Sequence, residues 1–184
     1  MEPTPNTSSN PQARLTGAVY LAYFLTAMLG QGLISDKLVF LGTTANLISA
    51  ALYAVLTILL YLLFKPVNRN LSLLAAILSL AGCVCTVLTI FHLAAARTPL
   101  FFFAPYCLLL GYLILRSTFL PRALGVLMML AGIGWILFLI PPIGTPLTVP
   151  IEGLGILAEA LLMLWLLIKG VNIPRWHRQA TQTT

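Results

Sequence analysis

Residues 44–64 of this chain read TANLISAALYAVLTILLYLLF, and Lys65 follows at once. The stretch carries no charge and has the length needed to cross the hydrocarbon core of a bilayer, which takes about 20 apolar residues. The whole chain has the same character, since 60% of its 184 residues are hydrophobic, 8% are charged and the mean hydropathy is +1.00. A soluble domain has about 25% charged residues. The composition therefore predicts an integral membrane protein.

The same composition excludes two other classes of protein. Intrinsic disorder requires low hydrophobicity, and this chain is far too apolar for it. Nucleic-acid binding is excluded despite a net charge of +6, because the basic residues are scattered singly instead of being gathered on one polar face.

Charges, prolines and glycines divide the chain into six apolar segments. We expect an all-α bundle of six transmembrane helices over residues 14–170, with a disordered polar tail at 1–13 and a basic tail at 171–184. Residues 35–43 are ambiguous between an interfacial segment and the start of the second helix. The predicted helices span residues 15–34, 44–64, 71–96, 99–115, 121–140 and 150–168.

The basic residues predict the orientation of these helices. With six spans, one side holds only Lys37 and Arg97, and the other side holds the remaining eight. The positive-inside rule then places both termini in the cytoplasm, with the chain in the cell membrane. The first helix is a retained anchor, because no positive region precedes it and no cleavage pattern follows it. The eight are Arg14, Lys65, Arg69, Arg116, Arg122, Lys169, Arg175 and Arg178.

Several stretches next to the predicted cytoplasmic turns are distinctive. The longest is GYLILRSTFLPRALGVL at 111–127. Two shorter stretches accompany it, FKPVNRNL at 64–71 and LWLLIKGV at 164–171, and the second of these follows Glu159. Together they resemble domain-of-unknown-function family 4386, a set of prokaryotic multi-span membrane proteins. The resemblance covers residues 12–172, and it implies a membrane topology but no activity.

Glu159 is the only ionisable residue near the middle of a predicted span. It lies ten residues from Lys169, which is about 15 Å along a helix. A charged acid at that depth costs roughly 2.5–3.5 kcal/mol, so we expect Glu159 to face the bundle interior in its protonated form. Pro105 should kink the fourth helix and free a backbone carbonyl near this depth. The candidates for binding a ligand or a proton are Glu159, Tyr106, Tyr53, Glu152, His92 and Asn46.

Two interpretations of Glu159 remain open. In one, it lies at the floor of a polar cavity that opens outward and accepts a proton or a cation. In the other, it ties the sixth helix to a tyrosine or to a free carbonyl, and such bonds contribute about 0.6 kcal/mol on average. A cavity continuous from Glu159 to the outer face would favour the first, and a dry midplane would favour the second.

The sequence contains no motif for catalysis, metal binding or cofactor binding. No Gly-x-Ser-x-Gly is present, and no ligand set has tetrahedral metal spacing. His92 is the only histidine in a predicted span, so a haem held by two histidines is not expected. Cys83, Cys85 and Cys107 are expected to be small buried hydrophobic residues. We therefore predict no catalytic residue, no metal and no cofactor.

The basic side is expected to lie on anionic lipid headgroups, where each basic residue contributes about 1 kcal/mol. The partners predicted are thus the bilayer and either a second copy of the chain or another membrane protein. The predicted headgroup contacts are Arg116, Arg122, Lys65, Arg69, Lys169, Arg175, Trp176 and Arg178.

Three functions agree with these observations. The sequence favours a structural, accessory or regulatory bundle without catalytic activity. The alternative is a small transporter or ligand-binding membrane protein with its site at Glu159. A membrane enzyme is the third, and it has no motif to support it.

Overall fold

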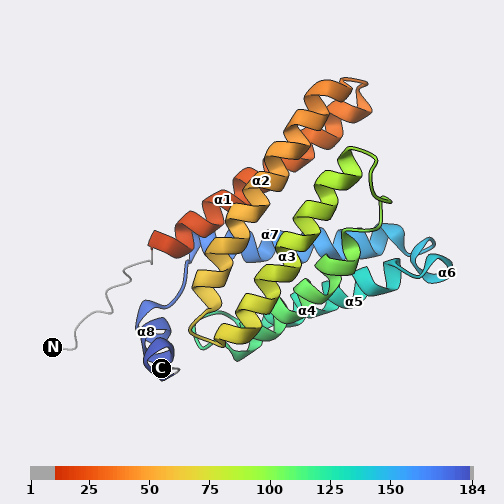
Figure 1. Ribbon diagram of the computed structural model, residues 1–184. Coiled ribbons are helices and arrows are strands. Elements are labelled where there is room, and N and C mark those ends of the chain that lie inside the picture. Colours follow the sequence, from red (N-terminus) through yellow and green to blue (C-terminus); the bar gives the residue numbers. More distant parts are fainter. Residues whose placement is uncertain (1–10, 183–184) are drawn as a thin grey trace.

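The computed structural model describes residues 11–182, which form helices and no strand (Figure 1). This confirms the predicted all-α class. The helices are α1 (Pro11–Ser35), α2 (Val39–Phe64), α3 (Arg69–Ile90), α4 (Leu100–Arg116), α5 (Arg122–Phe138), α6 (Pro141–Gly144), α7 (Thr148–Ile168) and α8 (Ile173–Gln182).

Most of the helices have the length and apolar composition of membrane-spanning segments. Among the described residues, α1, α2, α3 and α7 are long and apolar enough to cross a membrane. Helices α4 and α5 are shorter apolar helices of 17 residues each. The chain is therefore an all-helical protein with several membrane-type helices.

The six long helices form a ring. The main contacts run from α1 to α2, α3, α4, α5 and α7 in turn, and α7 packs back against α1. Short turns after α2 and α4 bring the start of α1, both turns and α8 to one end of the bundle, the α8 end (Figure 1). At the opposite end the helix hairpins spread apart in the same view. The buried core lies inside the ring and includes Tyr20, Leu56, Ile114, Leu162 and Leu166.

The first two helices are longer than the sequence suggests. The described part of α1 begins at Pro11, four residues before the predicted start, so residues 11–13 of the expected tail are helical. Residues 1–10 of the expected tail lie outside the described residues. Helix α2 begins at Val39, so residues 39–43 are part of the second helix. The connection is a tight turn at Lys37, whose φ of 65° is left-handed.

The third helix is shorter than predicted, and the C-terminal segment is more ordered. Helix α3 ends at Ile90 instead of residue 96, because His92 adopts a left-handed φ of 58° and the backbone leaves the helical path. Residues 91–99 then form a turn-rich connection. Gly170, with a φ of 65°, ends α7 in the way expected of a helix C-terminus. The segment after it folds as α8.

Glycines allow two pairs of helices to approach closely. A Cβ on Gly111 or on Gly125 would lie 2.8 Å from the carbonyl oxygen of the other residue, so α4 and α5 touch through their backbones. A Cβ on Gly17 would lie 2.5 Å from the backbone nitrogen of Leu167, so α1 and α7 do the same. Small residues serve this purpose in membrane helices, where close packing replaces the hydrophobic effect.

Candidate functional site

A cavity of about 430 Å³ lies between α1, α5 and α7, and Glu159 is in its wall. We call it the Glu159 cavity. Its positions on α1 run from Tyr23 to Gln31, one turn after another, so it extends from the middle of α1 toward the spread end of the bundle. The lining is apolar except for Glu159, Gln31 and the Tyr23 hydroxyl. The lining residues are Tyr23, Phe24, Ala27, Met28, Gln31, Trp135, Gly155, Ile156 and Glu159.

Gly155 and Trp135 shape the wall of the Glu159 cavity. A Cβ on Gly155 would lie 2.5 Å from Cζ2 of Trp135, so the indole packs closely against the α7 backbone. The Trp135 ring also packs edge-on against Phe138, with the centroids 6.0 Å apart. An aromatic face is thus held in place on the side opposite α1.

A second cavity, of about 330 Å³, lies on the other side of α1, between α1, α2, α3 and the start of α4. We call it the Asn46 cavity. It shares Tyr23, Ala27 and Gln31 with the Glu159 cavity, so this stretch of α1 separates the two. Its lining is more polar, and it contains two of the predicted candidates, Asn46 and Tyr53. Its other polar members are Ser49, Thr86 and Thr89.

Glu159 is partly buried on α7, inside the ring and next to four tyrosines. Tyr20 is the side chain whose hydroxyl lies nearest to a polar contact with its carboxyl, and its ring is buried in the core. Three further tyrosines are near enough for their hydroxyls to interact electrostatically with Glu159, namely Tyr23, Tyr53 and Tyr106. The structure therefore gathers Glu159, Tyr53 and Tyr106, three of the predicted candidates, in one region. Cys107 follows Tyr106 on α4 and is buried.

The tyrosines belong to a continuous aromatic cluster. Tyr23 packs edge-on against Tyr53 with centroids 4.7 Å apart, and Tyr53 contacts Phe103 at 5.4 Å and Tyr106 at 6.4 Å. The cluster links α1, α2 and α4 across the ring. The Tyr106 hydroxyl is buried and has no hydrogen-bond partner among the described residues, which is unusual for a buried polar group.

Two predicted candidates lie away from both cavities. Glu152 is exposed on the first turns of α7 and lines neither cavity. His92 is exposed in the connection after α3, where its role is the left-handed turn. Helix α4 runs through Pro105 as one helix. The structure thus separates Glu152 and His92 from the group around Glu159, whereas Pro105 directly precedes Tyr106.

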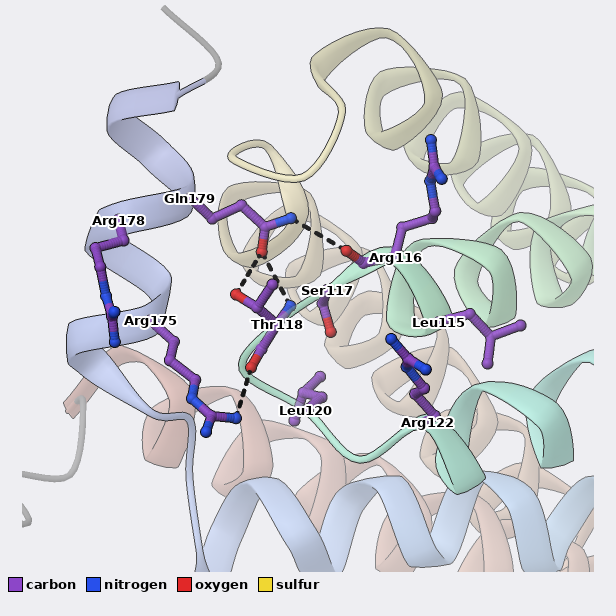
Figure 2. A pocket seen from close by; sticks show the side chains of 9 residues that line it. All are labelled: Leu115, Arg116, Ser117, Thr118, Leu120, Arg122, Arg175, Arg178 and Gln179. Carbon is purple, nitrogen blue, oxygen red and sulfur yellow. Dashed lines mark hydrogen bonds between the residues drawn. The ribbon is translucent and has the colours of Figure 1, made fainter.

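The predicted headgroup residues lie at the α8 end and fall into two sets. Lys65, Arg69 and Lys169 lie at the ends of α2, α3 and α7 and are exposed. The indole Nε1 of Trp176 donates to the Leu63 carbonyl at 3.0 Å, which fixes α8 to the end of α2. The second set surrounds a cavity of about 620 Å³ between α8 and the α4–α5 turn (Figure 2). This set is Arg116, Arg122, Arg175 and Arg178.

Reasoning from sequence missed three residues of the Glu159 site, namely Tyr20, Tyr23 and Trp135. Thr26, another polar residue in the middle of α1, takes no part in the site, because its hydroxyl donates to the Ala22 carbonyl at 2.7 Å. A helical-face criterion would have found the tyrosines, because positions 20, 23, 27 and 31 lie three or four residues apart on one side of α1.

The described residues contain no group of three His, Cys, Asp or Glu side chains that could hold a metal ion. Among residues 11–182 the acids are Asp36 in the turn after α1 and Glu152 and Glu159, which are seven residues apart on α7. The chemistry available at the Glu159 site is therefore that of one carboxyl, several phenols and aromatic faces.

Comparison with known proteins places the chain among uncharacterised relatives. Residues 97–170, which run from the start of α4 to the end of α7, match the family described as Domain of unknown function (DUF4386). An uncharacterized protein of Archaeoglobus fulgidus is 32% identical over 120 residues, which cover 60% of this chain and 72% of the relative. No solved structure matches the chain.

Proposed function

The chain belongs to the DUF4386 family, and on that premise we propose that it is a six-span membrane protein that binds a small ligand at Glu159. This is the alternative that the sequence ranked second, after an accessory bundle. The Glu159 cavity is the observation that moves it to first place. The protein is proposed to lie in the cytoplasmic membrane of a prokaryotic cell with both termini inside.

The ring of helices supports six spans. Helices α4 and α5 have 17 residues each, which is about 25 Å of helix at 1.5 Å per residue. That length is at the short end of the range for spanning helices, and bilayers thin locally around short helices. Each of the two packs against neighbours that are long enough to span. An even number of spans agrees with the placement of both described ends at the α8 end.

The Glu159 cavity supports binding at the middle of the membrane. A purely structural carboxyl would be enclosed by packed side chains, whereas Glu159 lines about 430 Å³ of empty space. The cavity leads toward the spread end of the bundle, which the basic residues assign to the outside. Burial of an ionisable group within a membrane is costly, so its retention next to a cavity favours a functional role.

The lining of the cavity points to a class of ligand. Phe24, Met28 and Ile156 offer apolar surface, and Trp135 and Tyr23 offer aromatic faces. A cation placed near such faces is stabilised by about 0.5–2 kcal/mol. The protonated Glu159 carboxyl would give its proton to the incoming amine, and the carboxylate that results supplies the opposite charge. The ligand that fits is a small apolar molecule with an amine head group, oriented with the amine toward Glu159.

The test compares two ligands on the wild type and three variants in nanodiscs. Phenylbutylamine and phenylbutanol have the same apolar body, and only the first carries a cationic head. We expect native mass spectrometry to detect phenylbutylamine on the wild type and a loss of about tenfold or more in affinity for Glu159→Gln, since charged hydrogen bonds contribute about 1.5–3 kcal/mol.

Glu152→Gln is the matched control, because Glu152 is an exposed acid on the same helix and lines neither cavity. The affinity of Glu152→Gln for phenylbutylamine should equal that of the wild type. Ala27→Leu should also reduce binding by filling the cavity wall, without any change of charge. Equal binding of the amine and the alcohol, or unchanged binding in both Glu159→Gln and Ala27→Leu, would return the accessory function to first place.

A further inference from the structure

Four arginines from two separate parts of the chain surround one cavity at the α8 end. Arg116 ends α4 and Arg122 begins α5, whereas Arg175 and Arg178 are on α8 (Figure 2). The cavity has a volume of about 620 Å³. Its polar wall is completed by the neighbouring turn residues, and Leu115 and Leu120 add an apolar edge.

None of the four guanidinium groups has a carboxylate partner among residues 11–182. The acids described there are Asp36, Glu152 and Glu159, and none of them lines this cavity. Asp36 is in the turn between α1 and α2, at the opposite end. Four like charges around one cavity repel one another, so an anion in the cavity would lower the electrostatic free energy.

The contacts of these arginines leave donors available. Arg175 Nη1 donates to the Thr118 carbonyl at 3.4 Å, and Arg178 Nε donates to the Pro174 carbonyl at 3.2 Å. The Arg116 guanidinium lies 5.8 Å from the centre of the Tyr112 ring. Each guanidinium has five N–H donors, so the cavity is surrounded by many more donors than these contacts use.

Hydrogen bonds hold the two sides of the cavity in a fixed relation. The Gln179 side chain accepts from the backbone N–H and the hydroxyl of Thr118, each at 3.1 Å, and donates to the Arg116 carbonyl at 3.2 Å (Figure 2). The Trp176 bond to α2 holds the other side of α8. The arginines of α8 are therefore positioned against those of α4 and α5 before any ligand arrives.

We propose that this cavity, the four-arginine cavity, is a binding site for a phosphate group. Guanidinium groups bind phosphate oxygens in pairs with fixed geometry, which is why arginine is favoured where phosphate is recognised. An acyl chain attached to that phosphate would meet the apolar edge formed by Leu115 and Leu120. The phosphate belongs to an anionic phospholipid or to a free phosphate compound, and both offer the same chemistry to the arginines. This site is independent of the Glu159 cavity.

The test compares a double variant that removes two arginines of the cavity with a control double variant that removes two basic residues outside it. Arg122→Gln with Arg178→Gln removes two charges from opposite sides of the cavity and spares the Arg175 and Gln179 contacts that dock α8. Lys65→Gln with Arg69→Gln removes two charges from the same end of the bundle, outside the cavity. The full chain is placed in nanodiscs of phosphatidylcholine with a minor fraction of phosphatidylglycerol, and bound lipid is counted by native mass spectrometry.

We expect the cavity pair to lose about tenfold in retained phosphatidylglycerol, and the matched pair to lose less than about threefold, since loss of a charged hydrogen bond costs about 1.5–3 kcal/mol. In lipid-free detergent, inorganic pyrophosphate is titrated by calorimetry. If pyrophosphate binds and the cavity pair abolishes it, while phosphatidylglycerol is retained equally by all forms, the source is a free phosphate compound. Equal losses in both pairs, or no loss of either probe in the cavity pair, would overturn the proposal.

Discussion

At the scale of single residues, Gly17 determines how closely α1 can approach α7. The Glu159 site depends on this contact, because Tyr20 follows one turn later on α1. We expect Gly17→Leu to destabilise the protein by about 1–3 kcal/mol, the usual cost of overpacking, because any Cβ there would overlap the Leu167 backbone. Thermal unfolding in detergent, followed by intrinsic fluorescence, measures the loss.

Gly153→Leu is the control for this prediction. No atom lies within 4 Å of a Cβ at Gly153, and the position is exposed on α7. The substitution should leave the melting temperature unchanged or raise it slightly, since leucine has a higher helix propensity than glycine by up to about 1 kcal/mol. Equal destabilisation by both substitutions would contradict the close approach of α1 and α7.

At the scale of an element, α8 depends on a few directional contacts. Trp176→Phe keeps the aromatic ring and removes the Nε1–H that donates to the Leu63 carbonyl. Loss of such a bond costs about 1 kcal/mol, which is about a fivefold change in an opening equilibrium. Hydrogen exchange across residues 173–182 should therefore become about fivefold faster, with no change in α2.

Trp165→Phe provides the comparison, because Trp165 is on α7 and the substitution leaves α8 and its hydrogen bonds intact. Exchange in α8 should then equal that of the wild type. If Trp176→Phe has no effect on exchange in α8, the Gln179 contacts alone hold the helix.

The elements also mark the limit of what the sequence predicts. Apolar length indicates helices well, because a bilayer demands about 20 apolar residues whatever the neighbours are. The ends are less predictable: His92 and Lys37 are ordinary residues in the sequence, and only the fold gives them left-handed backbones. Helix α8 is polar, so hydropathy gives no sign of it, and it is held by contacts with distant parts of the chain.

The residues of the candidate site likewise fall into those that the sequence could predict and those that it could not. Depth along a helix led to Glu159, Tyr53 and Tyr106, because each can be counted from a basic residue at the predicted interface. It could not supply the direction in which a side chain points, so exposed Glu152 and His92 were included and Tyr20 and Trp135 were missed. The four arginines were predicted individually as headgroup contacts. Their gathering around one cavity depends on α8 returning to the α4–α5 turn.

At the scale of the whole molecule, charge and fold together predict a single orientation of the protein in the membrane. Of the 10 basic residues, eight are on the predicted inner side and Lys37 and Arg97 are on the other. In intact cells we therefore expect a membrane-impermeant maleimide to label Thr145→Cys and to leave Asn70→Cys and His177→Cys unlabelled. All three positions are exposed in the structure, so all three should react once the membrane is permeabilised. Wild type, whose Cys83 and Cys107 are buried, sets the background.

The pattern of labelling separates errors in orientation from errors in the number of spans. Asn70 precedes four of the proposed spans and His177 follows the last of them, so both are on one side only if that number is even. Labelling of both in intact cells, with Thr145→Cys protected, would reverse the orientation and keep six spans. Labelling of one without the other would mean that one of the short helices, α4 or α5, does not cross. In that case the helix that does not cross would lie in one leaflet of the bilayer. The ring would then not span the membrane, and the proposed path from Glu159 to the outer face would be lost.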